Sequence, residues 1–341
     1  MTHLLLVEGG GSRTWTATTT DGTVTATVEG PSTSPRSVGE QEALATLTRL
    51  ILRLAGQGGP AGVVAAHGAA STTACAAAFH ALVHRAVAAA GLRRVPVLVA
   101  NDIVPHLLPT AGGDGGAVCA VICGTGTGYA ARNDGAWARA GGREWLLSDE
   151  GGGHDLATHA LRAVVRAGDG RGPATALTAA ARTWTDHHGR QSADGAGPGE
   201  ALFHTVHTNG NTVKPLVTSF AEHVVTAAAA GDPVAGRLLD GSARELAAGA
   251  LAVTAAAGIG DGTPLTLVLG GSLLTGTRLL RDRFLAHAGL VRPGVTLREA
   301  AAPGPGLLRL AALWPDGDGL AALARVLPLH ADAAPHRADV S

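Results

Sequence analysis

The sequence predicts an α/β protein with two similar lobes and a cleft between them. Strands and helices alternate along much of the chain, which is typical of sheets with parallel strand pairs covered by helices. Each half also opens with the same pattern of apolar strand, glycine-rich turn and second strand, at residues 3–28 and 116–132. We expect an N-terminal lobe of residues 1–113 plus about 316–329, a C-terminal lobe of residues 114–315, and a loose tail of residues 330–341.

The elements of the N-terminal half follow from the spacing of apolar residues. Strands are expected where short runs rich in Val, Thr and Leu end at turn residues, and Asp21-Gly22 signals a hairpin. Helices are expected where apolar residues recur at intervals of three and four. The expected strands are His3–Glu8, Trp15–Thr20, Thr23–Val28, Gly62–Ala66 and Val95–Ala100, and the expected helices are Ser37–Ala55 and Thr72–Ala90.

The C-terminal half repeats this organisation with longer helices. A polar stretch rich in Gly, Ser and Asp interrupts its helical region near residues 189–200. The expected strands are Gly116–Cys123, Tyr129–Arg132 and Leu265–Leu269, and the expected helices are Asp149–Arg166, further helices to about Ala257, and one from the Gly270-Gly271-Ser272 turn to about His287.

Composition and charge exclude several classes of protein. The chain has 341 residues, of which 46% are hydrophobic and 16% charged, so it can bury a large core. Its 26 basic and 27 acidic residues give a net charge of -1, which argues against nucleic acid as the main partner because no basic excess can displace counterions. The one lysine, Lys214, lies in no Walker or protein-kinase motif, so a lysine-dependent phosphate loop is excluded.

The N-terminus and the cysteines predict a cytoplasmic protein. Met1–Glu8 has no basic segment and contains an acid, unlike a secretory signal. The apolar stretch Leu246–Ile259 is shorter than the roughly 20 residues that span a bilayer. Cys75, Cys119 and Cys123 are odd in number and lie in apolar runs, which predicts free buried thiols. No His or Cys spacing in the chain predicts a zinc site.

Three glycine-rich turns follow apolar strands. Backbone N–H groups in such turns can surround an anion, and glycine allows a phosphate to approach closely. Ordinary hairpin turns in a glycine-rich protein are the alternative, but equivalent placement in two lobes favours a nucleotide. No turn reads G-x-G-x-x-G, which disfavours a Rossmann dinucleotide site. The turns are Gly9-Gly10-Gly11-Ser12-Arg13, Gly124-Thr125-Gly126-Thr127-Gly128 and Gly270-Gly271-Ser272.

Carboxylates follow one strand and precede one helix of the predicted fold. Asp102 comes directly after Asn101 and the strand ending at Ala100, where open α/β sheets bind their ligands, so it could accept a proton from an attacking hydroxyl. A helix cap is the alternative. Asp149 and Glu150 could bind sugar hydroxyls or form the acidic first turn of a helix.

The ordered set of motifs resembles the N-acetylglucosamine kinase family, which belongs with the BadF/BadG/BcrA/BcrD ATPases in the actin–hexokinase–Hsp70 superfamily. The resemblance extends from residue 4 to about 328. Its motifs are Val-Glu-Gly-Gly-Gly-Ser-Arg, Pro-Ser-Thr-Ser-Pro, Asn-Asp, Cys-Gly-Thr-Gly-Thr-Gly, Trp-Leu-Leu-Ser-Asp-Glu-Gly and Leu-Gly-Gly-Ser. It implies two ribonuclease-H-like, actin-like ATPase lobes that close over Mg-ATP and a sugar.

The resemblance also assigns roles to residues. The turn from Gly9 to Arg13 would be the first phosphate loop, with Glu8 placing hydrated Mg²⁺, and the turn at Gly124, Thr125, Gly126 and Thr127 would be the second. Gly270, Gly271 and Ser272 would face the adenosine. Asp102 would be the base that deprotonates the sugar hydroxyl, and Thr33, Ser34, Asn101, Asp149 and Glu150 would contact the sugar.

Three features depart from the family pattern. Ser34 replaces an asparagine, Arg143-Glu144 replaces Trp-Gly, and His154-Asp155 replaces an aromatic pair. An additional acid at Glu144 would suit an ammonium group better than an acetamide. Drift at positions that do not touch the substrate is the alternative explanation.

The sequence therefore predicts an ATP- and Mg²⁺-dependent kinase of an amino sugar such as N-acetylglucosamine or glucosamine. A kinase of a larger aminated or aminoglycoside-like natural product is the first alternative, and a BadF-type activator ATPase is the second. The expected partners are a small sugar or aminated sugar and a second copy of the chain, with no nucleic acid and no membrane.

Overall fold

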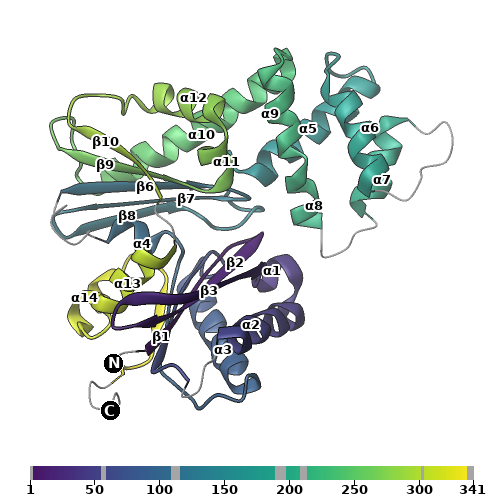
Figure 1. The fold of residues 1–341 in the computed structure, drawn as a ribbon. Helices are drawn as coiled ribbons and strands as arrows, with labels where there is room; N and C mark the ends of the chain where they lie inside the picture. The colour runs from purple at the N-terminus through teal and green to yellow at the C-terminus, as the bar shows by residue number, and fades with distance from the viewer. Residues whose placement is uncertain are drawn as a thin grey trace.

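The computed structural model describes residues 3–54, 59–108, 116–188, 197–207, 213–300 and 303–335. It contains two mixed sheets, which lie one above the other in Figure 1, each with helices packed on it. This confirms the predicted α/β class with two lobes. The predicted lobe boundary at residues 113 and 114 lies outside the described residues.

The first sheet is built mainly from the N-terminal residues. Its central strands are apolar and almost completely buried because helices cover both faces. β1 pairs antiparallel with β2 and parallel with β4, and β4 pairs parallel with β5. The strands are, in order across the sheet, β11 (Leu329–Ala331), β5 (Val97–Ala100), β4 (Gly62–His67), β1 (His3–Gly9), β2 (Arg13–Thr20) and β3 (Thr23–Pro31).

The second sheet repeats the arrangement of the first. β6 pairs antiparallel with β7 and parallel with β9, just as β1 pairs with β2 and β4. The strands are, in order, β10 (Val295–Glu299), β9 (Leu265–Gly270), β6 (Ala117–Cys123), β7 (Thr127–Asn133) and β8 (Ala136–Gly141). The internal duplication predicted from the two strand–turn–strand patterns is therefore a repeat of a five-stranded unit.

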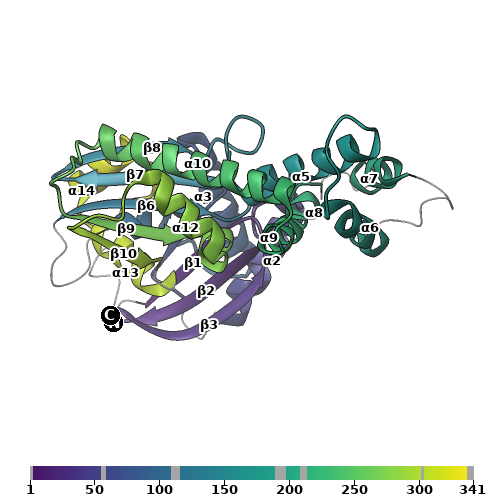
Figure 2. The same ribbon diagram turned by 90° about the horizontal axis from the view of Figure 1, so that it is seen from above.

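Helices cover both sheets and leave one helical region to the side. α2 and α3 pack on one face of the first sheet, and α10 crosses the second sheet against β6, β7 and β8. α6 and α7 project away from both sheets (Figures 1 and 2). The helices are α1 (Pro35–Val38), α2 (Glu40–Leu54), α3 (Thr73–Ala89), α4 (Val104–Leu107), α5 (Gly153–Gly168), α6 (Leu177–His188), α7 (Pro198–His207), α8 (Val213–Ser219), α9 (Ala221–Ala229), α10 (Pro233–Ala256), α11 (Ser272–Gly276), α12 (Arg278–Ala288), α13 (Pro303–Leu313) and α14 (Gly317–Ala324).

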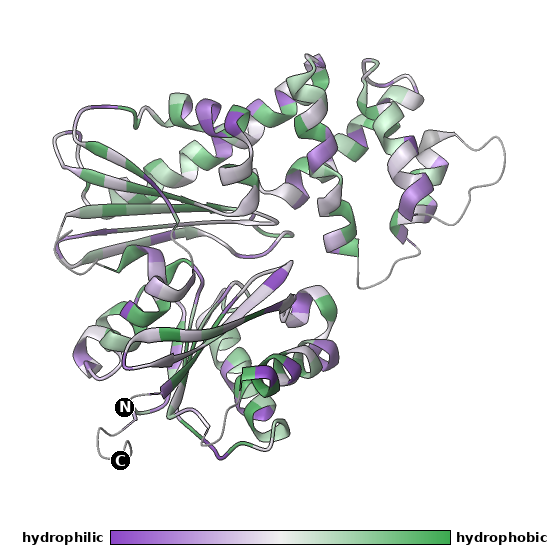
Figure 3. Ribbon diagram, viewed as in Figure 1, coloured by the Kyte–Doolittle hydropathy of each residue, from purple (hydrophilic) through white to green (hydrophobic). Residues whose placement is uncertain are grey.

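A shared apolar cluster joins the two lobes. α4 contacts β6 and β7 of the second sheet and α13 on the side of the first. The cluster includes Leu6 and Val64 from the first sheet, Val118 and Val268 from the second, and Leu107 from α4. In Figure 3 long hydrophobic stretches run along the strands of the second sheet. Because α4 follows β5 directly, the end of β5 is fixed at the junction of the lobes.

Several predicted elements differ in extent from the observed ones. The helix expected over Ser37–Ala55 is divided by Gly39 into α1 and α2, and Ala55 lies outside the described residues. The helix expected from Asp149 begins only at Gly153. The helix after the third glycine turn is divided at Thr277. The strands β8, β10 and β11 were not predicted, because they are short, partly exposed edge strands without a continuous buried apolar run.

The C-terminal residues join the first lobe more extensively than expected. His330 and Ala331, predicted as part of a loose tail, belong to β11, which pairs antiparallel with β5. The expected second lobe extends to residue 315, but α13 packs against β1 and β4 of the first sheet. Residues 336–341 of the predicted tail lie outside the described residues. Within the described ranges, no helix is both long and apolar enough to cross a membrane.

Candidate active site

A cleft of about 660 Å³ lies between the lobes, at the carboxyl ends of the parallel strands. This is the edge of an open α/β sheet at which ligands bind. Two predicted site residues, Thr33 and Glu150, do not line the cleft. Those that do are Glu8, Gly9, Gly10, Gly11, Ser12, Arg13, Ser34, Asn101, Asp102, Gly124, Thr125, Gly126, Thr127, Glu144, Asp149, Gly270, Gly271 and Ser272.

The first glycine turn joins β1 to β2, and hydrogen bonds fix its carbonyl groups. The Gly68 N–H donates to Gly9 O at 2.9 Å, and Ser32 Oγ donates to Gly10 O at 2.8 Å. A carbonyl and the next N–H point in opposite directions across a planar trans peptide. The N–H of Gly11 therefore points away from Ser32. A Cβ atom at Gly11 would lie 3.4 Å from Thr125 Oγ1, so the first turn faces the second.

The second glycine turn joins β6 to β7 and is held by the start of α5. The Gly153 N–H donates to Gly124 O at 2.8 Å, and the His154 N–H donates to Thr125 O at 3.0 Å. These bonds satisfy two of the N–H groups that a helix N-terminus leaves without intrahelical partners. By the same planarity of the peptide, the N–H groups of Thr125 and Gly126 point away from α5.

The third glycine turn follows β9 and lies against the second. Gly271 has a φ of 84°, and a Cβ there would lie 2.3 Å from the backbone of Cys123, so only glycine fits. A Cβ on Gly124 would lie 3.8 Å from the Ser272 backbone nitrogen. All three predicted turns therefore come together in one cleft, where their backbones can surround an anion.

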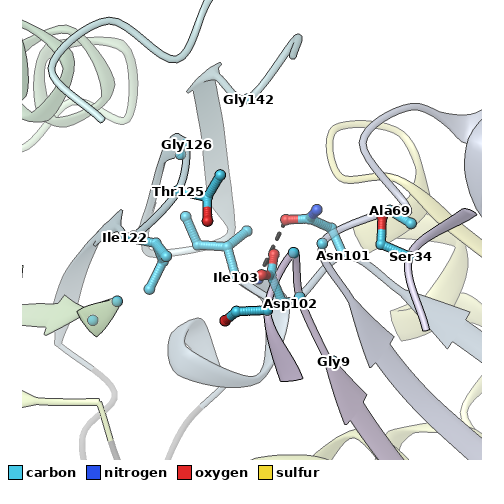
Figure 4. Close-up of a pocket in the computed structure, with 18 of the residues that line it drawn as sticks. Gly9, Ser34, Ala69, Asn101, Asp102, Ile103, Ile122, Thr125, Gly126 and Gly142 are labelled. Carbon is cyan, nitrogen blue, oxygen red and sulfur yellow. Dashed lines mark hydrogen bonds between the residues drawn. The ribbon is translucent and has the colours of Figure 1, made fainter. Parts of the chain in front are cut away.

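Asp102 lies beside the first glycine turn, at the end of β5. A Cβ on Gly68 would lie 3.2 Å from Asp102 Oδ2 and 3.6 Å from Gly10 Cα. In Figure 4 Asp102 lies between the strand of Gly9 and the turn of Thr125. No side chain makes a capping hydrogen bond at the start of α4, and the Ile103 N–H donates to Asn101 Oδ1 at 3.2 Å. The alternative that Asp102 is a helix cap is therefore wrong.

Burial changes the acidity of two neighbouring carboxyl groups. Removal from water raises the pKa of Asp102 to about 6, with Arg139 opposing this and Asp149 adding to it. Burial and the charge of Asp102 raise the pKa of Glu8 to about 7 against the effect of Arg13. Asp102 thus has the acidity of a proton acceptor that works near neutral pH.

Asp149 connects the second turn to the opposite end of the cleft. Its Oδ1 accepts a hydrogen bond from the Thr127 N–H at 3.2 Å, and its own backbone is left-handed with a φ of 69°. The expectation that it might form the acidic first turn of a helix is wrong, because α5 starts at Gly153. Glu150 is exposed and does not line the cleft.

A network of four charged side chains lies at the end of the cleft that Glu144 and Asp149 line. Lys214, at the start of α8, lies 3.1 Å from Glu144 and 3.7 Å from Asp149. Arg36 Nη1 lies 2.6 Å from the other carboxylate oxygen of Glu144. Burial opposes the ionisation of Glu144, but the two cations hold its pKa below the ordinary value. Glu144 therefore already has two cationic partners, which disfavours the expectation that it would bind an ammonium group.

Three charged residues that line the cleft, Arg36, Lys214 and Arg139, were not predicted as site residues. Arg139 Nη2 donates to Ser71 O at 2.7 Å and to Gly142 O at 3.1 Å, which links the two lobes across the cleft. These residues occur in no shared local motif, because they come from segments that only the fold brings together. The sequence gives one hint of this network, which is that Lys214 is the only lysine of the chain. That hint excludes lysine-dependent phosphate loops but does not indicate which residues Lys214 contacts.

Thr33 lies in the loop between β3 and α1, beneath the surface of the cleft. It is completely buried, and its Oγ1 is 2.9 Å from Thr14 Oγ1 and 3.1 Å from His67 Nε2. His67 Nδ1 accepts from the Ala69 N–H at 2.9 Å, so its Nε2 carries the proton and donates to Thr33. Burial lowers the pKa of His67 to about 3. Thr33 therefore positions Ser34, which does line the cleft.

Two kinases are similar to this chain, one in sequence and one in sequence and fold. A curated N-acetylmuramic acid/N-acetylglucosamine kinase from Clostridium acetobutylicum is 29% identical over 178 residues, which cover 52% of this chain and 55% of that protein. The chain thus matches only about half the length of this relative. A candidate N-acetylglucosamine kinase from Chromobacterium violaceum is 26% identical, with a TM-score of 0.64 over 91% of this chain and 99% of that one.

Two further comparisons agree with the fold and extend along most of the chain. A candidate N-acetylglucosamine kinase from Porphyromonas gingivalis has a TM-score of 0.62 over 90% of this chain and 97% of that one, at 17% identity, which shows the shared fold alone. Residues 7–283 match the BadF/BadG/BcrA/BcrD ATPase family, a range that includes all three glycine turns and Asp102. The chain therefore belongs to the BadF/BadG/BcrA/BcrD ATPase family.

Proposed function

We propose that this protein is an ATP-dependent sugar kinase, which transfers the γ-phosphate of ATP to a hydroxyl of an amino sugar such as N-acetylglucosamine or glucosamine. The observation that carries the proposal is the position of Asp102. Its carboxylate lies next to Gly10 and Gly68, in the cleft where the three glycine turns meet. A base beside a phosphate site, with room for a small molecule, is the arrangement that phosphoryl transfer to an alcohol requires.

The three glycine turns would bind the nucleotide. The first and second turns would hold the phosphates through the N–H groups of Gly11, Thr125 and Gly126, and Gly270-Gly271-Ser272 would lie against the adenosine. Phosphoryl transfer depends on alignment and charge stabilisation rather than on covalent catalysis by the protein. A site made from backbone N–H groups is therefore sufficient without a phosphate-loop lysine.

Glu8 suits a magnesium ion, and Asp102 beside it would stay free to act as the base. The charge of Asp102 raises the pKa of Glu8, so the two carboxylates are close enough to repel each other in a partly buried cleft. Mg²⁺ prefers carboxylate oxygens, water and phosphate oxygens, and one or two carboxylates are enough to hold it. When bound with ATP, the ion would neutralise charge on the phosphates.

Asp102 would act as the general base. The acceptor hydroxyl transfers its proton to Oδ2 of Asp102 as its oxygen bonds to the γ-phosphorus, and the bond from that phosphorus to the bridging oxygen of ADP breaks. A base with a pKa of about 6 is largely ionised at neutral pH, so it can accept this proton. The positive charge of Arg139 favours the ionised form of Asp102, so it would help to keep the base deprotonated.

The sugar would occupy the end of the cleft lined by Ser34, Asn101, Glu144 and Asp149. Asp149 and Glu144 offer carboxylate oxygens to sugar hydroxyls, while Lys214 and Arg36 neutralise their charge. These ion pairs favour an amino sugar with at most one ammonium group over a polycationic, aminoglycoside-like acceptor, because ammonium groups would compete with Lys214 and Arg36 for the two carboxylates. The relative from Clostridium acetobutylicum, an N-acetylmuramic acid/N-acetylglucosamine kinase, also supports an N-acetylated amino sugar.

A panel of acceptors assayed for ADP formation tests the proposal. The panel holds N-acetylglucosamine, glucosamine, N-acetylmuramic acid and an aminoglycoside, each with Mg-ATP and with a no-acceptor control. We expect ADP release that depends on one of the amino sugars. ADP release that no acceptor stimulates would contradict the kinase, and stimulation by the aminoglycoside alone would favour a kinase of a larger natural product.

The activator alternative has little support from the cysteines. A cluster shared between two chains needs thiolates at a surface, but Cys119 and Cys123 are completely buried in β6, and burial raises the pKa of each thiol to about 12. Cys75, which is half-buried instead of buried as predicted, is the remaining cysteine of the chain. The homodimer and the cytoplasmic location stay predictions; light scattering and cell fractionation test them.

A further inference from the structure

A cluster of two imidazoles and one carboxylate lies outside the cleft, and none of its three residues lines it. His80 and His84 are four residues apart on α3 and so lie on the same face of this helix. Asp332 follows β11 and approaches both: its Oδ2 is 2.8 Å from His84 Nε2 and 3.4 Å from His80 Nε2. Among the described residues, this is the one group of three His, Cys, Asp or Glu side chains whose ligand atoms lie within 4.8 Å of one another.

One nitrogen in this cluster is buried without a hydrogen bond. The His80 residue is 7% exposed, and its Nε2 atom makes no hydrogen bond within the described part of the chain. A buried polar atom without a hydrogen bond destabilises the folded state, so such atoms are rare in native proteins and often indicate a missing ligand. The atom is directed toward the Asp332 carboxylate, which already accepts from His84 and from the Val97 N–H. A cation among these groups would give His80 its missing partner.

We infer that His80, His84 and Asp332 form a binding site for a zinc-like divalent transition metal. Imidazole nitrogens and a carboxylate oxygen are ligands that Zn²⁺ and Co²⁺ accept, whereas Mg²⁺ prefers oxygen ligands. Ligands about 2.1 Å from a tetrahedral ion lie roughly 3.4 Å apart, so small side-chain adjustments bring all three into position. His330 of β11, whose ring lies 4.6 Å from that of His80, provides another nitrogen beside the site.

The surroundings hold the carboxylate in place for this purpose. The Val97 N–H donates to Asp332 Oδ2 at 3.0 Å, which leaves the second lone pair of that oxygen for an ion. The backbone of Asp332 is fixed on both sides, since its N–H donates to Val97 O at 2.9 Å and its carbonyl accepts from Trp314 Nε1 at 3.0 Å. Such outer hydrogen bonds orient metal ligands.

The metal would join the C-terminal end of the described chain to the first lobe. β11 pairs with β5, where Leu329 lies opposite Ala100, two residues before Asp102. An ion held between α3 and Asp332 would therefore brace the edge strand that flanks the base-bearing strand. We assign the site a structural role, separate from the Mg-ATP cleft, and expect its occupancy to change thermal stability.

Metal titration of full-length, tag-free protein, freed of metal by a chelator, tests the site. Co²⁺ is the spectroscopic probe, because tetrahedral cobalt absorbs in the visible range, and Zn²⁺ is titrated by calorimetry. We expect one tightly bound ion per chain and a rise in Tm on adding Zn²⁺. Two variants, Asp332→Asn and His84→Gln, should each weaken binding by more than about 100-fold, because even outer-shell partners contribute about 10- to 100-fold.

The matched control is His159→Gln. His159 lies 3.4 Å from Asp155 on α5, an exposed His–Asp pair at the same four-residue spacing that belongs to no three-ligand group in the described ranges. This variant should bind metal as the unmodified protein does. Asp332→Asn keeps an oxygen for the Val97 N–H, and its Tm without metal reports whether it folds. Absence of the cobalt absorption, or equal metal affinity in all four proteins, would overturn the inference.

Discussion

The two ends of the cleft are constructed in different ways. The proposed nucleotide end is formed by the backbone of three glycine turns, and Gly68, Ser32 and the first turn of α5 hold the carbonyl groups of the first two. The acceptor end is formed by side chains, with Glu144 and Lys214 at its centre. A backbone site is encoded locally, at strand ends that repeat in both lobes. The side-chain site requires segments that only tertiary structure brings together.

Asp102 lies where the two ends meet, so its replacement should have the largest effect. Asp102→Asn keeps the size of the side chain and removes the proton acceptor. We expect kcat to fall by about 10²- to 10⁴-fold, the usual contribution of a general base. Steady-state ADP formation with the best acceptor of the panel measures this. A variant with more than about half the original kcat would show that the base is elsewhere.

Filling the nucleotide end should have the next largest effect. Gly11 does not have a positive φ, and a Cβ there would meet only ordinary contacts, at 3.4 Å from Thr125 Oγ1 and 3.6 Å from Ser37 Oγ. Gly11→Val should therefore fold, but it places methyl groups between the first two glycine turns. We expect kcat/KM for ATP to fall roughly 100-fold, as for other misplacements of about 1 Å. Gly241→Ala on α10, where a Cβ meets nothing within 4 Å, is the control and should leave kcat/KM unchanged.

Removing the charge of Lys214 should change the KM for the acceptor without changing the KM for ATP. Lys214→Met removes the cation shared by Glu144 and Asp149 and leaves two partly buried carboxylates with less compensation. We expect the acceptor KM to rise about tenfold, equivalent to about 1.4 kcal/mol, while the KM for ATP changes little. The exposed pair of Arg278 and Asp282 offers a control, Arg278→Met, with no expected effect. A parallel rise in both KM values would mean that the two ends are not distinct.

The raised pKa values predict loss of activity in mild acid. The proposed base must be ionised, and its pKa is about 6, so kcat/KM for the acceptor should fall about tenfold between neutral pH and pH 5. A rate profile with saturating ATP measures this. A profile that stays flat down to pH 5 would be inconsistent with Asp102 as the base.

Glu8 and Asp102 should make thermal stability fall as pH rises, whereas catalytic activity should rise. Glu8 and Asp102 have ordinary pKa values of 4.5 and 3.8, which are raised to about 7 and 6 in the folded protein. Between these limits the folded state binds more protons than the unfolded state, so their contribution to stability falls as pH rises. Tm should therefore decline less steeply from pH 5 to pH 7 in Asp102→Asn than in the unmodified protein. Parallel declines would contradict the raised pKa of Asp102.

The smallest effect is expected at a residue that the resemblance assigned to the sugar. Glu150 is exposed and does not line the cleft, although it lies next to Asp149 in the chain. Glu150→Gln should change the acceptor KM by less than about twofold, as surface substitutions usually do. A tenfold change would place the sugar differently from our account.

These differences explain how much of the site the sequence could predict. The glycine turns and Asp102 follow directly from strand ends, and all of them line the cleft. The roles of Thr33 and Glu150 could not be told from their neighbours, because side-chain direction depends on the left-handed backbone at Asp149 and on the buried contact with His67. The Lys214 contacts depend on α8, whose place beside α5 no local pattern reveals.

The fold was more predictable than the charged network for the same reason. Both sheets have central strands with continuous apolar runs, which are visible in the sequence. The edge strands β8, β10 and β11 are partly exposed and short, so their residues carry mixed patterns. The last of them pairs with β5 only because the chain returns from the second lobe, a long-range contact that periodicity does not report.

The most direct test of the division between the two ends is the affinity for ATP of two variants, measured by calorimetry with Mg²⁺ and without acceptor. We predict that Asp102→Asn binds ATP within about twofold of the unmodified protein, while Gly11→Val binds it roughly 100-fold more weakly. Equal losses of ATP affinity in both variants, or unchanged affinity in Gly11→Val, would contradict a nucleotide site formed by the glycine turns and separate from the base.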